Sequence, residues 1–193
     1  MPDEPEAAGL LALMLLNESR VAARSVGGAI VLLQDQDRTG WDRTLIEEGH
    51  TIVRDCIRVG RPGPFQVQAA IQAVHCHAGT FEATNWSQIV TLYDHLYSLM
   101  PSPVVALNRA IAIAEIDSPA AALTVLDGLG PELENYYPLH AARAATLRRL
   151  GRSSEAKAAY ERAATLTTSK ADRQFFVTQI NELAKRNGTD SSN

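Results

Sequence analysis

Apolar side chains recur along most of the chain at the three- and four-residue spacing of amphipathic α-helices, and glycine and proline interrupt this spacing at intervals. The spacing first predicts a helix over Ala7–Arg24 that ends at the pair Gly27–Gly28. Its apolar stripe is Leu10, Leu13, Met14 and Val21. The next segment, Ala29–Gly40, breaks the helical spacing. It starts with a short apolar run, which is the one strand candidate, and continues as a polar cluster, so we expect a structured loop.

A second helix is predicted from Trp41 or Asp42 to Val59, with Asp42 as its N-cap. Its apolar stripe is Leu45, Ile46, Ile52, Val53 and Ile57. The following run, Gly60–Pro64, contains two glycines and two prolines and predicts a firm end. We therefore expect an N-terminal helical region over residues 1–62, helical repeats with a capping helix over residues 63–186, and a disordered tail over residues 187–193.

Beyond this break the predicted helices come in pairs. They are Phe65–His77 and Asn85–Met100, Val104–Glu115 and Pro119–Leu129 (with Ser118 as N-cap), Tyr137–Leu150 and Ser153–Thr167, and a last helix from about Lys170 to Arg186.

A period of about 34 residues relates these pairs, as is typical of tetratricopeptide (TPR) arrays. The pattern positions Gly151, Ala156, Tyr160 and Ala163 correspond, one period earlier, to Asp117, Ala122, Leu126 and Leu129. Small residues at such positions let two helices approach each other, and a bulky residue fills the gap beside them. The predicted fold class is therefore all-α, with a helical N-terminal region followed by a short TPR-like helical-repeat array.

Amino-acid composition and charge exclude several classes of protein. Hydrophobic residues make up 46% of the 193 residues, enough for a continuous core, and a net charge of −4 offers no basic field for nucleic acid. The apolar run Leu10–Leu16 is too short to span a membrane and follows acidic residues, so we expect neither a membrane helix nor a signal peptide. Because Cys56 and Cys76 cannot form a disulfide framework, we expect a cytoplasmic location.

The cluster His75-Cys76-His77, with His50 and Cys56 upstream, is a candidate metal site. Histidines two positions apart point to different sides of a helix, however, and no paired spacing supplies further ligands. We therefore favour a structural interpretation, with Cys76 at a small contact position between the two histidines. A metallohydrolase built on His75 and His77 remains an alternative function.

Polar residues are densest between Gln34 and Asp42. Asp35 and Asp37 resemble paired carboxylates, but no histidine or nucleophile stands nearby for acid–base work, and the glycine and glutamate of a calcium loop are missing. Two interpretations stay open for Asp35, Asp37, Arg38 and Trp41. The side chains either cap the next helix and pair locally, or form an interdomain contact.

Asn108, Arg109, Arg143, Arg148 and Arg149 lie on the first helices of the repeat pairs. First helices line the concave groove of a TPR array, where arginines bind a partner's carboxylates. The alternative is that these arginines form salt bridges within the array. No phosphate-binding loop or catalytic triad order is present in the sequence, so we expect no enzymatic activity and no cofactor.

Five segments carry a resemblance to a known family. They are Leu10–Arg24 (LLALMLLNESRVAAR), Val31–Gly49 (VLLQDQDRTGWDRTLIEEG), Gly63–Val74 (GPFQVQAAIQAV), Ser102–Glu115 (SPVVALNRAIAIAE) and the repeat Tyr137–Ala163. The chain resembles the C-terminal extension of a group of extracytoplasmic-function (ECF) sigma factors whose extension carries TPR repeats. The resemblance covers about Pro5 to Leu183, and Asp35–Arg38 and Leu107–Ala110 are its most specific parts.

This resemblance implies a fragment that lacks the two sigma domains, and a regulatory role in transcription initiation. The partners that it implies are the sigma-2 and sigma-4 type domains of the parent protein, the RNA polymerase core, and a small YCII-related protein of the DGPF type. It implies no direct DNA binding by this fragment. An alternative is a stand-alone TPR adaptor that binds a peptide segment of a partner through Arg148 and Arg149.

Overall fold

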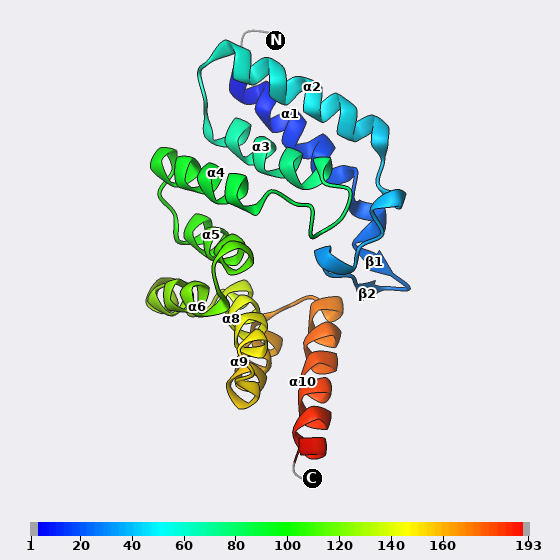
Figure 1. Cartoon of the computed structure of the whole chain (residues 1–193), viewed down its shortest axis with the longest axis vertical. Helices are drawn as coiled ribbons and strands as arrows, with labels where there is room; N and C mark the ends of the chain where they lie inside the picture. Colours follow the sequence, from blue (N-terminus) through cyan, green and yellow to red (C-terminus); the bar gives the residue numbers. More distant parts are fainter. Residues whose placement is uncertain (1–3, 191–193) are drawn as a thin grey trace. The chain divides into compact units, whose positions relative to one another are not determined.

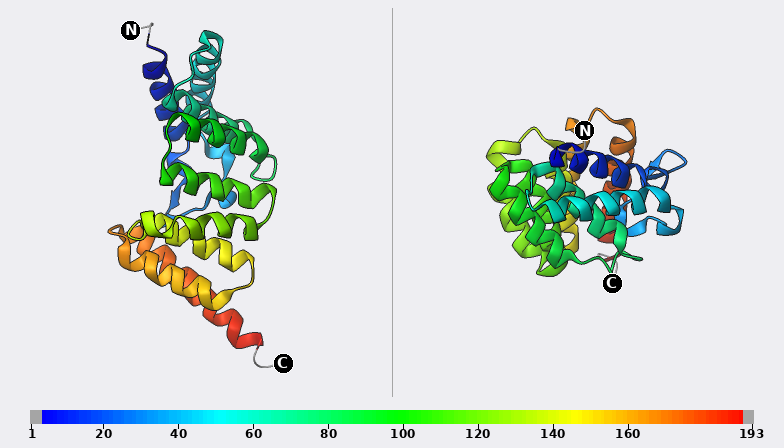
Figure 2. Two further views of the ribbon diagram at one scale, coloured as in Figure 1. Left: turned by 90° about the vertical axis from the view of Figure 1, so that its left-hand side faces the viewer. Right: turned by 90° about the horizontal axis from the view of Figure 1, so that it is seen from above.

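The computed structural model describes the backbone of residues 4–190 and the side chains of residues 4–185. Over this range the chain is an all-α helical-repeat protein, which confirms the predicted fold class (Figures 1 and 2). The helices are α1 (Pro5–Glu18), α2 (Arg43–Val59), α3 (Pro64–His77), α4 (Trp86–Leu99), α5 (Pro103–Ile116), α6 (Pro119–Gly128), α7 (Gly130–Leu133), α8 (Tyr137–Arg149), α9 (Ser153–Leu166) and α10 (Lys170–Asp190).

The single described sheet is a hairpin of two short strands, β1 (Ser25–Val26) and β2 (Ala29–Ile30). Gly27 and Gly28 form its turn with φ of 58° and 82°, a region that glycine enters without steric strain. The rest of the predicted loop forms two single-turn 3-10 helices, Leu33–Asp35 and Arg38–Gly40. The apolar run after Gly28 is thus a strand for only two residues.

Contacts divide the chain into two compact units. Unit 1 comprises residues 1–27 and 31–105, and unit 2 comprises residues 28–30 and 106–193. Unit 1 therefore holds α1 to α4, and unit 2 holds most of α5 together with α6 to α10. The predicted boundary at residue 62 falls between α2 and α3, which both lie in unit 1.

In unit 1, α1 packs against both α2 and α3, and α3 packs against α4 (Figure 1). Two glycines allow the close approach of α1. A Cβ atom on Gly9 would lie 2.6 Å from Cγ of Gln66, and one on Gly49 would lie 2.7 Å from Cγ of Leu16. The core of this unit contains Ala12, Leu16, Trp41, Ile46, Val53, Ala69, Ala73 and Cys76.

The predicted first helix differs from α1 in length and orientation. The helix ends at Glu18, six residues early, and a 3-10 turn follows over Val21–Ala23. Its inward face carries Gly9, Ala12 and Leu16, whereas three side chains assigned to the apolar stripe are exposed, namely Leu10, Met14 and Val21. Because α1 is apolar on most sides, periodicity could not show which side packs.

The residues that begin and end α2, in contrast, were correctly predicted. The Asp42 carboxylate accepts hydrogen bonds from the backbone N–H groups of Thr44 and Leu45 at the start of α2. Gly60 ends that helix with φ of 67°. Within the predicted stripe of α2, Ile46 and Val53 are buried, but Ile57 is 69% exposed.

In unit 2, α8 packs against α6 and α9, and α9 packs against α10 (Figure 2). The core contains Leu123, Ala144, Leu147, Ala156, Tyr160, Ala163, Phe176 and Leu183. Positions one period apart are equally buried: Ala110 and Ala144 are fully buried, and so are Ala122 and Ala156. The bulky positions Leu126 and Tyr160 are also buried, so the predicted register agrees with the packing there, whereas Leu129 is half-buried and its counterpart Ala163 is fully buried.

The two repeat turns differ. Gly151 has φ of 73° between α8 and α9, whereas the α5–α6 turn, which has Asp117 at the equivalent position, relies on the Ser118 hydroxyl accepting from the N–H of Ala121. The short helix α7 was not predicted. Helix α10 continues to Asp190 where the sequence predicts a tail, and residues 191–193 of that tail lie outside the described residues.

Candidate functional site

The loop between β2 and α2 has an inward and an outward side. Arg38 is only 6% exposed, and its guanidinium donates to the backbone carbonyls of His75 (2.9 Å) and Ala78 (2.8 Å) and to the Thr84 hydroxyl (3.3 Å). These carbonyls lie at and just beyond the end of α3, where helical acceptors lack partners within the helix. Arg38 therefore fixes the loop to the end of α3.

The Trp41 ring lies next to the Arg38 guanidinium, and the guanidinium of Arg20 is also near this ring. The guanidinium carbon of Arg38 is 4.8 Å from the Trp41 ring centroid, and that of Arg20 is 5.5 Å from it. Arg20 is also buried and donates to Oε1 of Gln72 at 2.6 Å. Burial lowers the pKa of both arginines, and within the described part of the chain neither forms a salt bridge to a carboxylate.

The outward side of the loop presents carboxylates. Asp35 is exposed, and its carboxylate makes no hydrogen bond within the described residues. Asp37 is also exposed and accepts from the N–H and hydroxyl of Thr39, and these bonds lower the pKa of its carboxyl. Of the two interpretations, the structure places Arg38 and Trp41 in a structural contact and leaves Asp35 and Asp37 facing solvent.

The histidine cluster is split between interior and surface. His75 is 9% exposed and packs edge-on against Trp86, with ring centroids 5.2 Å apart. Burial, and then the Arg20 and Arg38 cations, lower the pKa of His75 to about 4. His77 points outward instead, with its ring centroid 6.1 Å from that of His50. In the described residues no three His, Cys, Asp or Glu side chains gather so that they could hold a metal ion.

The predicted arginines of unit 2 are bound within the chain. Arg143 forms a salt bridge to Asp127 at 2.8 Å, and Arg148 donates to Oε1 of Gln179 on α10 at 2.6 Å. Arg149 pairs with Glu115, which lies 34 residues earlier on α5, and donates to the carbonyl of Ala114. Asn108 is exposed on α5, and its neighbour Arg109 is half-buried.

The structure thus brings Asp35, Asp37, Arg38 and Trp41 together in unit 1, and Arg143, Arg148 and Arg149 on α8 in unit 2. Sequence reasoning missed Arg20 as the second cation on Trp41 and the approach of His50 to His77. Neither had a local signal, because 21 and 27 residues of sequence separate the partners. Arg20, just beyond α1, reaches Trp41 through the packing of the first three helices, and the packing of α2 against α3 brings His50 to His77.

Comparison with known proteins places the chain near uncharacterised sequences. Residues 1–57 match a family of unknown function, DUF6596; the match covers α1, the loop and most of α2. The chain is also 44% identical over 189 residues to the uncharacterized protein R00370 of Rhizobium meliloti (strain 1021), which covers 97% of this chain but 45% of that protein. The chain thus spans less than half the length of the curated relative that it matches.

No solved structure matches the chain. None of the described helices combines the length and apolar character that a membrane crossing requires. The chain is therefore similar, over its first 57 residues, to the family DUF6596, and along nearly its whole length to a longer Rhizobium protein.

Proposed function

We propose that this chain is the regulatory C-terminal extension of an ECF-type RNA polymerase sigma factor, and that it modulates transcription initiation through protein contacts. The observation that carries the proposal is the loop at Asp35–Arg38. Its anchor, Arg38, is buried against α3, while Asp35 and Asp37 face solvent from a fixed backbone. The loop is also one of the two most specific parts of the resemblance to that family.

A loop fixed in this way suits a binding role for an energetic reason. Its conformational entropy is lost when the chain folds, so little further ordering is required when a partner binds. Two exposed carboxylates complement basic segments, such as those with which sigma domains and polymerase meet nucleic acid. The loop therefore supports contact with a basic protein surface.

The comparisons are compatible with this role. The matched family segment covers the loop, and more than half of the Rhizobium relative lies outside the aligned region, which leaves room for sigma domains. In our proposal, the extension holds the sigma-2 and sigma-4 type domains in an orientation that the polymerase core accepts or rejects, and a partner such as a small DGPF-type protein shifts that equilibrium.

The adaptor alternative has less support. It needs arginines that are available to an acidic peptide, but Arg148 is bonded to Gln179 of α10 and Arg149 to Glu115 of α5. A peptide would have to displace these partners. We therefore propose TPR-like repeats that hold the unit together, not an open peptide groove.

The test is a calorimetric titration of this chain into the purified sigma domains of the parent protein. The variants are Asp35→Asn and Asp37→Asn, because asparagine removes the charge and, at position 37, still accepts the hydrogen bond from the N–H of Thr39. Glu48→Asn, an exposed acid on α2, is the matched control. We expect saturable binding that the two loop variants weaken by about tenfold together and the control leaves intact. If the loop variants bind the sigma domains as tightly as the wild-type chain does, the loop is not part of the contact. If the wild-type chain does not bind them, the same titration is made with core polymerase.

A further inference from the structure

A groove runs along α2 in unit 1 and is made of three adjoining cavities. The first, of about 290 Å³, lies near Gly60 and is lined by Val53, Ile57, Ala70 and Leu92 among others. The second, of about 430 Å³, shares Val53, Ile57 and Ala70 with the first and continues to His50 and His77. The third, of about 470 Å³, shares those two histidines and ends at Arg43. Each cavity thus shares lining residues with the next, and we refer to the three together as the groove.

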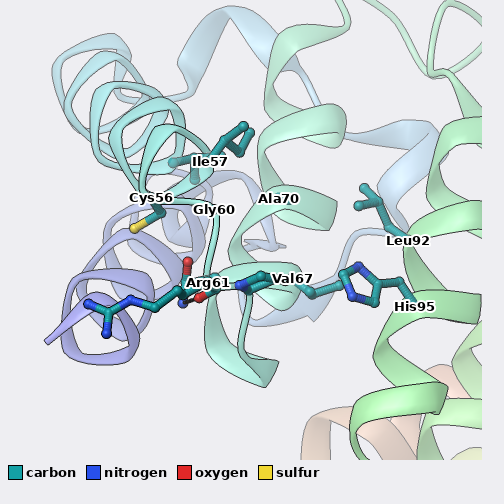
Figure 3. Close-up of a pocket in the computed structure, with 11 residues that line it drawn as sticks. Cys56, Ile57, Gly60, Arg61, Val67, Ala70, Leu92 and His95 are labelled. Atoms are coloured by element: carbon teal, nitrogen blue, oxygen red, sulfur yellow. Dashed lines mark hydrogen bonds between the residues drawn. The ribbon is translucent and has the colours of Figure 1, made fainter.

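The Gly60 end of the groove is apolar. Figure 3 shows Ile57 of α2 and Leu92 of α4 on opposite sides of α3, which carries Val67 and Ala70. The Arg61 guanidinium points away from these side chains in the same view. Ile57 is 69% exposed, although it lies beside other apolar side chains of the cavity lining.

The other end of the groove is electropositive. His50 and His77 face each other there with ring centroids 6.1 Å apart, and Arg43 and Arg54 line the adjoining cavity. Among the residues that line the second and third cavities, Glu47 is the one acid. Neither Arg43 nor Arg54 forms a salt bridge within the described residues. This local positive charge stands out in a chain whose net charge is −4.

We propose that this groove is a binding site for a small amphiphilic anion, whose apolar body lies between Val53, Ile57 and Ala70 and whose acidic group lies at His50 and His77. The cavities are of the size that holds small ligands, with apolar walls and a few polar groups at one end. Metal binding is disfavoured, because two arginines flank the histidine pair and no third ligand joins it among the described residues.

The titration of His50 fits an anion site. Burial, and then the nearby His77 and Arg54, lower the pKa of His50, because a further positive charge there is unfavourable. The other charged or titratable groups that line this end are Arg43 and Glu47 of α2 and Cys76 and His77 of α3. An anion bound between the rings would raise the pKa of His50 and would therefore bind more tightly when His50 is protonated.

The experiment is calorimetry of the full chain with decanoate, a fatty acid anion, and with decyltrimethylammonium, which has the same apolar chain and the opposite charge. Below their micelle concentrations, we expect decanoate to bind one to one and the cation to bind at least about tenfold more weakly. Equal binding of both probes would overturn the proposal, because it would show an apolar surface without charge selection.

Variants then locate the two ends of the ligand. Ile57→Asp places a carboxylate in the apolar wall and should weaken decanoate binding by about tenfold or more. Val59→Asp, an exposed position on the same helix outside the lining, is its matched control and should leave binding unchanged. The double variant His50→Gln with His77→Gln should reduce the charge preference, with Arg43 and Arg54 supplying the remainder, whereas His95→Gln at the apolar end should leave it unchanged.

Unchanged decanoate binding in Ile57→Asp would refute the assigned site, and no binding to the wild-type chain would refute the proposal outright. Circular dichroism of each variant shows whether its fold is intact, and the exposed positions of Ile57 and Val59 make both aspartates tolerable. The site does not depend on the proposed sigma role, because these measurements need neither polymerase nor sigma domains.

Discussion

The buried arginines of unit 1 and the surface arginines of unit 2 have different kinds of partner. In unit 1, Arg20 and Arg38 are buried around Trp41 and donate hydrogen bonds to an amide oxygen, a hydroxyl and backbone carbonyls. In unit 2, Arg143 and Arg149 lie near the surface and pair with carboxylates. Buried cations cost desolvation that only good hydrogen bonds offset, whereas surface pairs are nearly neutral in energy.

The interiors of the units differ accordingly. The repeat core of unit 2 is built from alanines around Tyr160 and Phe176, whose rings are 6.0 Å apart. Unit 1 has a polar centre in which His75, Trp41 and the two arginines meet. The difference teaches that the regular repeat of unit 2 is stabilised by the close packing of complementary apolar side chains, while the irregular unit 1 also depends on a few specific hydrogen bonds. Four predictions test this comparison.

The largest effect should come from the repeat core. Tyr160 is 2% exposed, so Tyr160→Ala leaves a large cavity and should lower the free energy of unfolding by about 4 kcal/mol. Denaturant unfolding of the full chain measures the change. Tyr136→Ala, at a tyrosine that is 38% exposed, is the control and should cost less than about 1 kcal/mol. Equal losses in both variants would contradict a core role for Tyr160.

The polar centre of unit 1 should make stability depend on pH. An unfolded histidine takes up a proton near pH 6.5, but folded His75 does so only near a pKa of about 4. The unfolded state therefore binds more protons between these values. The free energy of unfolding should fall by up to about 3 kcal/mol as pH drops from about 6.5 to about 4, with no contribution from His75 above that window.

Urea unfolding at a series of pH values measures this slope against the background of titrating carboxylates. His75→Gln should reduce the dependence of the free energy of unfolding on pH in this window. His77→Gln, at an exposed histidine outside the core, should leave that dependence unchanged. A wild-type slope that survives in His75→Gln would mean that another group supplies the acid sensitivity.

Loss of the loop anchor should have a smaller effect. Arg38→Met removes the donor for the carbonyls of His75 and Ala78 and the cation over Trp41, and should lower the free energy of unfolding by about 2 kcal/mol. Arg58→Met, at an exposed arginine paired with Asp55, is the matched control and should change it by less than about 0.5 kcal/mol. If Arg38→Met changed the free energy of unfolding as little as the control does, water would be replacing the guanidinium as the hydrogen-bond donor.

The smallest effect is expected for the surface pair of unit 2. Arg143→Ala should change the free energy of unfolding by about 0.5 kcal/mol, because both partners of the Asp127 pair remain accessible to water. A double-mutant cycle with Asp127→Ala measures the coupling directly. Coupling above about 2 kcal/mol would place this pair in the same class as the buried contacts of unit 1.

Sequence reasoning performed best where the cause is local. Asp42, Gly60 and Ser118 mark helix ends through their own backbone or side-chain bonds, and each lies where it was predicted. The repeat register of Ala122 with Ala156 and of Leu126 with Tyr160 was also visible, since equivalent packing recurs at equal spacing. The face of α1 was not predictable, because both of its sides are apolar and only its neighbours α2 and α3 select one.

The features of the candidate site likewise fall into those that local sequence signals predict and those that only long-range packing decides. The sequence by itself determined an all-α chain, the helix ends at Asp42, Gly60 and Ser118, the repeat spacing and the polar segment Asp35–Arg38, because periodicity, capping and turn chemistry act between near neighbours. Tertiary structure alone decided that Arg38 faces inward and Asp35 outward, that Arg20 joins Trp41, and that His50 meets His77. These contacts join segments far apart in sequence, and their geometry follows from how helices pack, for which the chain carries no local signal.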